Sequence, residues 1–97
     1  MTNDQAIQFA TSARAQFAVP AEYAVRSADL RIIEIVATEP VRDELPGPGP
    51  VIDRVAWLVR FGLDMVWAEL AVDDQSGRII RFRRSRGAAA SWNEERA

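Results

Sequence analysis

The chain contains no cysteine, no histidine and no lysine among its 97 residues. The absence of cysteine excludes disulfides, thiolate nucleophiles and cysteine zinc sites. Without histidine, the chain lacks the usual general base near neutral pH and the commonest metal ligand. Without lysine, neither a Schiff base nor a P-loop lysine can form. Catalysis would have to rest on carboxylates, hydroxyls and arginine, so we expect a protein that is not an enzyme and binds no metal or cofactor.

Long hydrophobic runs are also missing. No stretch approaches the roughly 18 consecutive apolar residues of a membrane helix. The segment Met1–Asp4 lacks the basic residues and following apolar run of a secretory signal, which predicts a cytoplasmic protein. Hydrophobic residues make up 48% and charged residues 27% of the chain, as in a folded domain. We expect a single domain over 1–87 and a flexible C-terminal tail over 88–97.

Charge is unevenly distributed along the chain. All twelve basic residues are arginine, and fourteen acids give a net charge of −2. Residues 1–74 have a net charge of −6, whereas residues 75–87 contain five arginines and no acid. The protein is therefore acidic with one basic segment.

The N-terminal segment 3–18 has the pattern of an amphipathic helix. Thr2 or Asn3 can cap its start, and apolar residues recur at spacings of three and four. Pro20 predicts its end, because the residue before a proline avoids the helical conformation. The apolar face that we expect to cover a sheet includes Phe9, Ala13 and Phe17.

The remaining chain predicts an antiparallel sheet of about four strands, and therefore an α+β fold with the helix packed on a meander. The first strand is expected over 29–38, where β-branched residues are dense. The preceding residues, 21–28, fit either a second helix or a short strand near Tyr23–Arg26. A loop rich in proline and glycine follows over 40–51. The three further strands are predicted over 53–61, 64–73 and 78–85.

Two hairpin turns connect these last strands. Gly62 and Leu63 are predicted to form the first turn. In the second turn, we expect Gly77 to adopt a left-handed conformation and Asp73 to cap the turn through nearby backbone groups. Alternation then predicts a buried face made of Val55, Trp57, Val59, Phe61, Val66, Ala68, Leu70, Val72, Ile80 and Phe82.

The segment from Trp67 to Ile80, with the sequence WAELAVDDQSGRII, resembles the final hairpin of PepSY-type domains. In that family a strand ends in Val-Asp, a polar turn with glycine follows, and a β-branched strand closes the sheet. The N-terminal helix, from Ala6-Ile7 onward, is also similar, so the resemblance covers the helix and residues 55–84. It implies a cystatin-like α+β fold and a non-enzymatic binding module, often one that restrains a peptidase.

The outer face of the predicted sheet is the candidate binding surface. Leu58, Met65 and Trp67 are expected there, flanked by Arg60 and Glu69. Adjacent apolar side chains with a tryptophan suggest a covered patch, and a symmetric homodimer is the simplest cover. The residues predicted to bind a partner are Leu58, Met65, Trp67, Arg81 and Arg83. We therefore expect a protein-binding or regulatory module that associates with itself or with an acidic protein.

Two alternatives remain open at this point. The arginine-rich last strand could bind nucleic acid, although a sequence pI near 5.1 argues against this, because nucleic-acid-binding domains are usually basic. A cystatin-like domain could instead bind a small ligand between helix and sheet, in a pocket lined by Tyr23, Trp57 and an acid. Binding to nucleic acid would weaken steeply with salt, whereas a protein interface dominated by Trp67 would change little.

Overall fold

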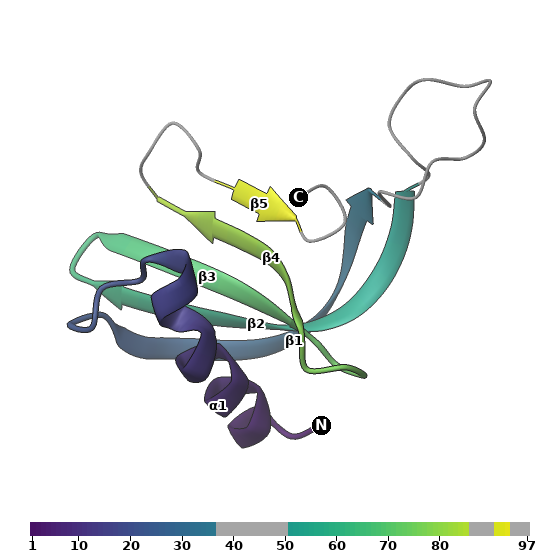
Figure 1. The fold of residues 1–97 in the computed structure, drawn as a ribbon, viewed down its shortest axis with the longest axis horizontal. Coiled ribbons are helices and arrows are strands. Elements are labelled where there is room, and N and C mark those ends of the chain that lie inside the picture. Colours follow the sequence, from purple (N-terminus) through teal and green to yellow (C-terminus); the bar gives the residue numbers. More distant parts are fainter. Residues whose placement is uncertain (37–50, 86–90, 94–97) are drawn as a thin grey trace.

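The computed structural model describes residues 1–36, 51–85 and 91–93 (Figure 1). One helix, α1 (Asn3–Ala13), continues into a short 3-10 helix (Arg14–Phe17) and precedes a five-stranded antiparallel sheet. The strands follow chain order: β1 (Ala24–Val36), β2 (Val51–Leu63), β3 (Val66–Asp73), β4 (Ile79–Arg84) and β5 (Ser91–Asn93). This confirms the predicted α+β meander with an N-terminal helix. The helices of the described ranges are too short or too polar to span a membrane.

The start and the end of the helix have local causes. Thr2 caps α1 in a capping box with Gln5: the Thr2 hydroxyl accepts from the Gln5 amide, and the Gln5 side chain accepts from the Thr2 amide. This arrangement satisfies amides that the first turn leaves free. The helical segment ends at Phe17, one residue before the predicted end, where Ala18 adopts a left-handed conformation with φ 56°.

The helix faces the sheet through small residues. Ala6 and Ala10 are fully buried, so α1 approaches the strands closely. Phe17 packs on Phe82, with ring centroids 5.4 Å apart. Phe9 was predicted to cover the sheet, but it is 46% exposed and lies near Gly77, whose missing side chain leaves room for the ring.

The ambiguity of residues 21–28 is resolved in favour of a strand. β1 begins at Ala24 and pairs with β2 along its whole length, with one irregularity between Val25 and Ser27. Long-range pairing thus decides a segment whose local pattern fitted helix or strand. The predicted loop over 40–51 lies outside the described residues except for Val51, which begins β2. Three residues of the predicted tail form β5 and pair with β4.

The first hairpin differs from its prediction. The strands continue to the pair Leu63–Val66, and the turn consists of Asp64 and Met65. Gly62 lies inside β2, where a Cβ atom would come within 2.7 Å of Arg26 Nε and 2.9 Å of the Val66 carbonyl oxygen. The glycine therefore serves close packing and not the turn. The left-handed residue of the turn is Asp64, with φ 55°.

The second hairpin is confirmed as predicted. Gly77 has φ 75°, and Asp73 accepts hydrogen bonds at Oδ2 from the Ser76 amide and hydroxyl, both at 2.8 Å. The carboxylate is thus engaged in holding its own turn.

The sheet carries a hydrophobic cluster on each face. The cluster under α1 consists of Ala6, Ala10, Val19, Val59, Phe61, Ala68, Leu70, Val72 and Phe82. The cluster on the opposite face consists of Ile33, Ile35, Ala56, Ala71 and Ile80. Ile80 was predicted to face the helix; this is wrong, because a bulge opposite Ala71 and Val72 inserts one residue into β4 and turns Ile80 to the other face.

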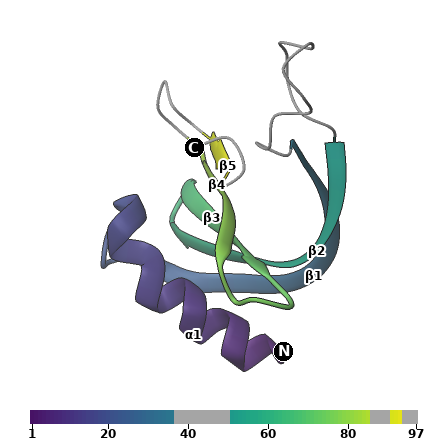
Figure 2. The ribbon, with the colours of Figure 1, turned by 45° about the vertical axis from the view of Figure 1, so that its right-hand side comes forward.

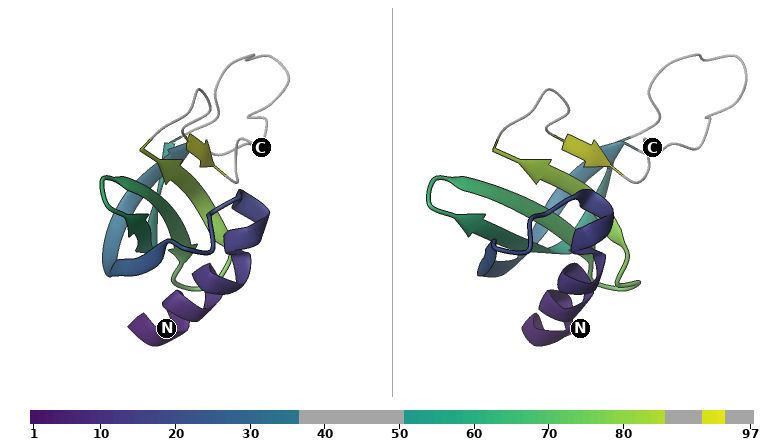
Figure 3. Two further views of the ribbon diagram at one scale, coloured as in Figure 1. Left: turned by 90° about the vertical axis from the view of Figure 1, so that its left-hand side faces the viewer. Right: turned by 60° about the vertical axis from the view of Figure 1, so that its left-hand side comes forward.

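The sheet is strongly curved. β1 and β2 bend away from α1 toward the ends that carry Val36 and Val51 (Figure 2). α1 covers only part of the sheet face on which it packs, as two further views show (Figure 3). This leaves Leu30, Ile32 and Val55 on the helix side but exposed, at 45%, 71% and 42%.

Candidate binding surface

Five side chains on three neighbouring strands form a charged surface opposite α1, which we call the arginine face. Pairing places Arg60 of β2 opposite Glu69 of β3, and Glu69 opposite Arg83 of β4. Trp67 lies two residues before Glu69, and Arg81 two residues before Arg83, so these side chains share the face. The arginine face consists of Arg60, Trp67, Glu69, Arg81 and Arg83.

Glu69 is the centre of this arrangement. Its side chain is only 6% exposed. Arg60 donates to Glu69 Oε2 at 2.9 Å, and Arg81 donates to Oε1 at 3.4 Å. The carboxylate is therefore compensated on both oxygens, as a buried charge requires. It also holds two guanidinium groups in place.

The remaining contacts add order and positive charge. The Arg60 guanidinium lies over the Trp67 ring, 4.2 Å from its centroid, in a cation–π contact. Burial and the neighbouring charge of Arg83 lower the pKa of Arg81, and Glu69 opposes this shift. Because an arginine pKa is so high, Arg81 stays charged at neutral pH. Three arginines against one glutamate leave the face with a surplus of two positive charges.

The structure brings only part of the predicted partner-binding set together. Trp67, Arg81 and Arg83 share the arginine face. Leu58 also lies on this side of the sheet, as predicted, but it packs against the second hydrophobic cluster and is half-buried. Met65 lies in the hairpin turn and is 90% exposed, because the turn is two residues later than predicted. In place of the predicted apolar patch, the structure has the arginine face, in which the Trp67 ring lies under a guanidinium group.

Trp57 has a different role from the one expected for it. It does not line a pocket with Tyr23 and an acid; its indole Nε1 donates to Asp74 Oδ1 at 2.9 Å. The amine of Met1 approaches the same oxygen at 3.3 Å. The Trp57 hydrogen bond, together with this amine, holds the pKa of Asp74 below its ordinary value, against a smaller opposing effect of burial. The contact connects the second hairpin to β2.

Acid is expected to remove the contribution of Asp74 to stability. A carboxyl whose pKa is lower in the folded state stabilises the fold above its ordinary pKa and loses this effect as pH falls through the folded value. The stability difference between the wild type and Asp74→Asn should therefore be present at neutral pH and vanish in strong acid. Urea unfolding across this range measures it, with the exposed Asp29→Asn as control. A difference that persists in acid would contradict the assignment.

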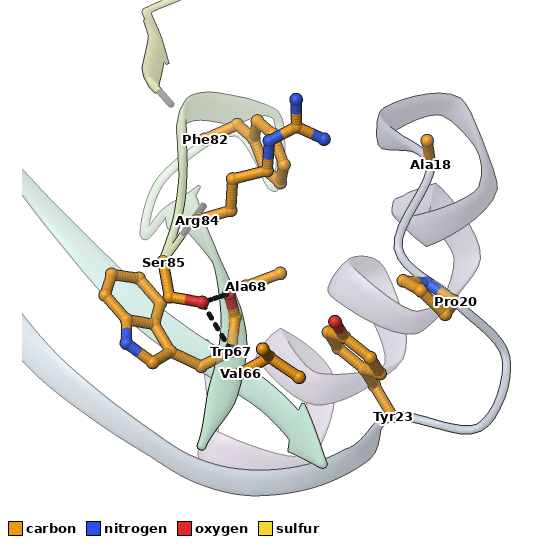
Figure 4. Close-up of a pocket in the computed structure, with 9 residues that line it drawn as sticks. All are labelled: Ala18, Pro20, Tyr23, Val66, Trp67, Ala68, Phe82, Arg84 and Ser85. Atoms are coloured by element: carbon orange, nitrogen blue, oxygen red, sulfur yellow. Dashed lines mark hydrogen bonds between the residues drawn. The ribbon is translucent and has the colours of Figure 1, made fainter. Parts of the chain in front are cut away.

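A small pocket lies on the helix side of the sheet, at the end where β3 begins and β4 ends (Figure 4). It has a volume of about 160 Å³ and lies between the segment that follows the 3-10 helix and the adjoining ends of β3 and β4. Tyr23 lines it, as predicted, but with Arg84 in place of Trp57 and an acid; the Trp67 indole points away from Tyr23 (Figure 4). No sequence pattern indicated Arg84 as a pocket residue, since this depends on the phase of β4.

The described residues thus form an α+β domain with an ordered, positively charged surface opposite α1 and a small pocket on the helix side. No protein-family model, no curated protein and no solved structure matches the chain.

Proposed function

We propose that this domain is a non-enzymatic protein-binding module whose arginine face binds an acidic segment of a partner protein. The observation that carries the proposal is the buried carboxylate of Glu69, which holds Arg60 and Arg81 in fixed positions. Arginines that are already ordered lose less conformational entropy when a partner binds. Their planar forks match carboxylates in pairs.

The composition of the face supports a protein partner. Tryptophan and arginine are the residues most enriched among those that dominate protein interfaces. Nucleic acid would require an extended basic surface, whereas this chain has a net charge of −2 and concentrates its positive charge in one place. A short acidic segment needs only this local surplus. The resemblance to PepSY-type domains supports the same class of function.

Two adjacent arginines of β4 provide a matched test. Arg83 belongs to the arginine face, and Arg84 faces the helix side, so both variants remove one exposed charge from the same strand. A peptide of six glutamates should bind the wild type and bind Arg83→Gln about fivefold more weakly, in the range of one exposed ion pair. Arg84→Gln should change its affinity less than twofold. Tryptophan fluorescence or calorimetry measures the binding.

Three results would contradict this function. Equal losses in both variants would show attraction by total charge alone. Equal binding of a six-glutamine peptide would show that carboxylates are not recognised. Tighter binding of a single-stranded oligonucleotide, with steep salt dependence, would assign the face to nucleic acid.

Self-association is a second candidate, favoured by a different observation. Ile32 pairs with Val55, and Leu30 lies beside them on the uncovered part of the helix-side face. A homodimer would bury this strip. Light scattering should then give twice 10.8 kDa at low and at high salt, and Ile32→Glu should give the monomer mass. Met65→Glu, outside the strip, is the control. A monomeric wild type would exclude self-association.

A further inference from the structure

The pocket of Figure 4, here called the Tyr23 pocket, is apolar over most of its wall. Carbon surfaces come from the segment after the 3-10 helix, from the start of β3 and from β4. The apolar residues that line it are Ala18, Pro20, Val66, Ala68 and Phe82. A cavity of about 150 Å³ holds one benzene ring, so about 160 Å³ suits an apolar body of that size.

Two polar groups accompany this apolar wall. The Tyr23 side chain points its hydroxyl into the pocket, and the Arg84 guanidinium extends above it toward Ala18 (Figure 4). Within the described part of the chain, neither group has a hydrogen-bond or ion-pair partner. The Ser85 hydroxyl, by contrast, is occupied by the backbone of Trp67. A pocket in which the described residues leave a cation and a hydroxyl without partners favours an anionic oxygen ligand.

The wall on the helix side is held in place. Arg14 donates from one guanidinium nitrogen to the carbonyl oxygens of Pro20 and Tyr23. The same guanidinium stacks over the Phe61 ring, 4.6 Å from its centroid. The loop that carries Tyr23 is thus tied to the hydrophobic core, and the pocket exists before any ligand arrives, as is usual for small-molecule sites.

We propose that the Tyr23 pocket binds a small monocarboxylate whose apolar part is about the size of one benzene ring. The apolar part fills the cavity, and the carboxylate lies between the Arg84 guanidinium and the Tyr23 hydroxyl. This goes beyond the protein-binding function, because the pocket lies on the opposite face of the sheet from Arg83 and takes a different class of ligand. The two sites share β3 and β4.

Phenylacetate, with phenylacetamide as its neutral counterpart, tests the proposal by amide chemical-shift titration of the whole chain. Phenylacetate should bind more tightly than phenylacetamide and shift amides of residues 18–23 and 66–68. Arg84→Gln should weaken phenylacetate about fivefold and leave phenylacetamide unchanged. Tyr23→Phe should also weaken phenylacetate, whereas Arg83→Gln should not.

Equal affinity for the two compounds would overturn the proposal, because the carboxylate would then contribute nothing. An absence of shifts with phenylacetate, or equal losses in Arg83→Gln and Arg84→Gln, would overturn it as well. The amide spectrum of each free variant shows whether it is folded. Failure here is distinguishable from failure of the arginine face, since the glutamate peptide is expected to depend on Arg83 and not on Arg84.

Discussion

Replacing Phe61 by alanine is expected to lower the free energy of unfolding by about 4 kcal/mol, in the range measured for buried phenylalanines. The Phe61 ring is fully buried in the cluster under α1, and the Arg14 guanidinium covers it. Removing the ring leaves a cavity and takes away the surface on which Arg14 lies. Urea unfolding measures the change.

This loss is large for a chain of this size. Domains are typically stable by only about 5–15 kcal/mol, so the variant should be close to unfolding at ordinary temperature. Val55→Ala is the control, because Val55 is 42% exposed and should cost less than about 1 kcal/mol. A loss below about 1.5 kcal/mol for Phe61→Ala would show that the ring is not central to the core.

Replacing Arg14 is expected to have the second largest effect. Arg14→Ala should cost about 3 kcal/mol, because two carbonyls lose a charged donor and the Phe61 ring loses the packing of the arginine stem. Arg14→Met keeps an apolar chain over the ring, so it should cost about 2 kcal/mol. The difference between the variants separates packing from hydrogen bonding.

The Arg14 variants should also loosen one local segment. Amide hydrogen exchange should become faster over residues 18–23, where Arg14 binds the carbonyls of Pro20 and Tyr23, and change little in the second hairpin. Arg31→Ala is the control: Arg31 is exposed and, among the described residues, bonds to the neighbouring Leu30 carbonyl alone, so its loss should cost less than about 0.5 kcal/mol. Unchanged exchange over 18–23 would contradict the role assigned to Arg14.

Local rules were sufficient where a few neighbouring residues decide the structure. The capping of α1 by Thr2 and the turn built from Asp73 and Gly77 both depend on contacts within five residues. The alternation of Val59, Phe61, Leu70 and Val72 also placed most of the core correctly. Such features follow from side-chain periodicity and turn chemistry.

Local rules failed where distant segments decide. Gly62 looks like a turn residue, but it is needed because Arg26 and the Val66 carbonyl approach it. The long pairing with β2 makes residues 24–28 a strand. The candidate site was half predictable for the same reason. Trp67, Arg81 and Arg83 follow from the alternation of side chains along the strands. The position of Met65 depends on the turn, and the role of Arg84 in the pocket depends on the end of the helical segment opposite it.

The bulge in β4 determines which chemistry each side of the sheet presents. If β4 paired without it from Ile79 onward, Arg81 would lie opposite Leu70 and Phe82 opposite Glu69, since a slip of one residue exchanges the two faces. Buried charge would then replace the core, and an aromatic ring would replace the cation beside Glu69. The adjacent residues Ile79 and Ile80 show the effect of the bulge: Ile79 packs, partly buried, on the helix side, and Ile80 is buried on the opposite side. One inserted residue thus sets the alternation of β4, so that Phe82 faces the hydrophobic core and Arg81 faces Glu69.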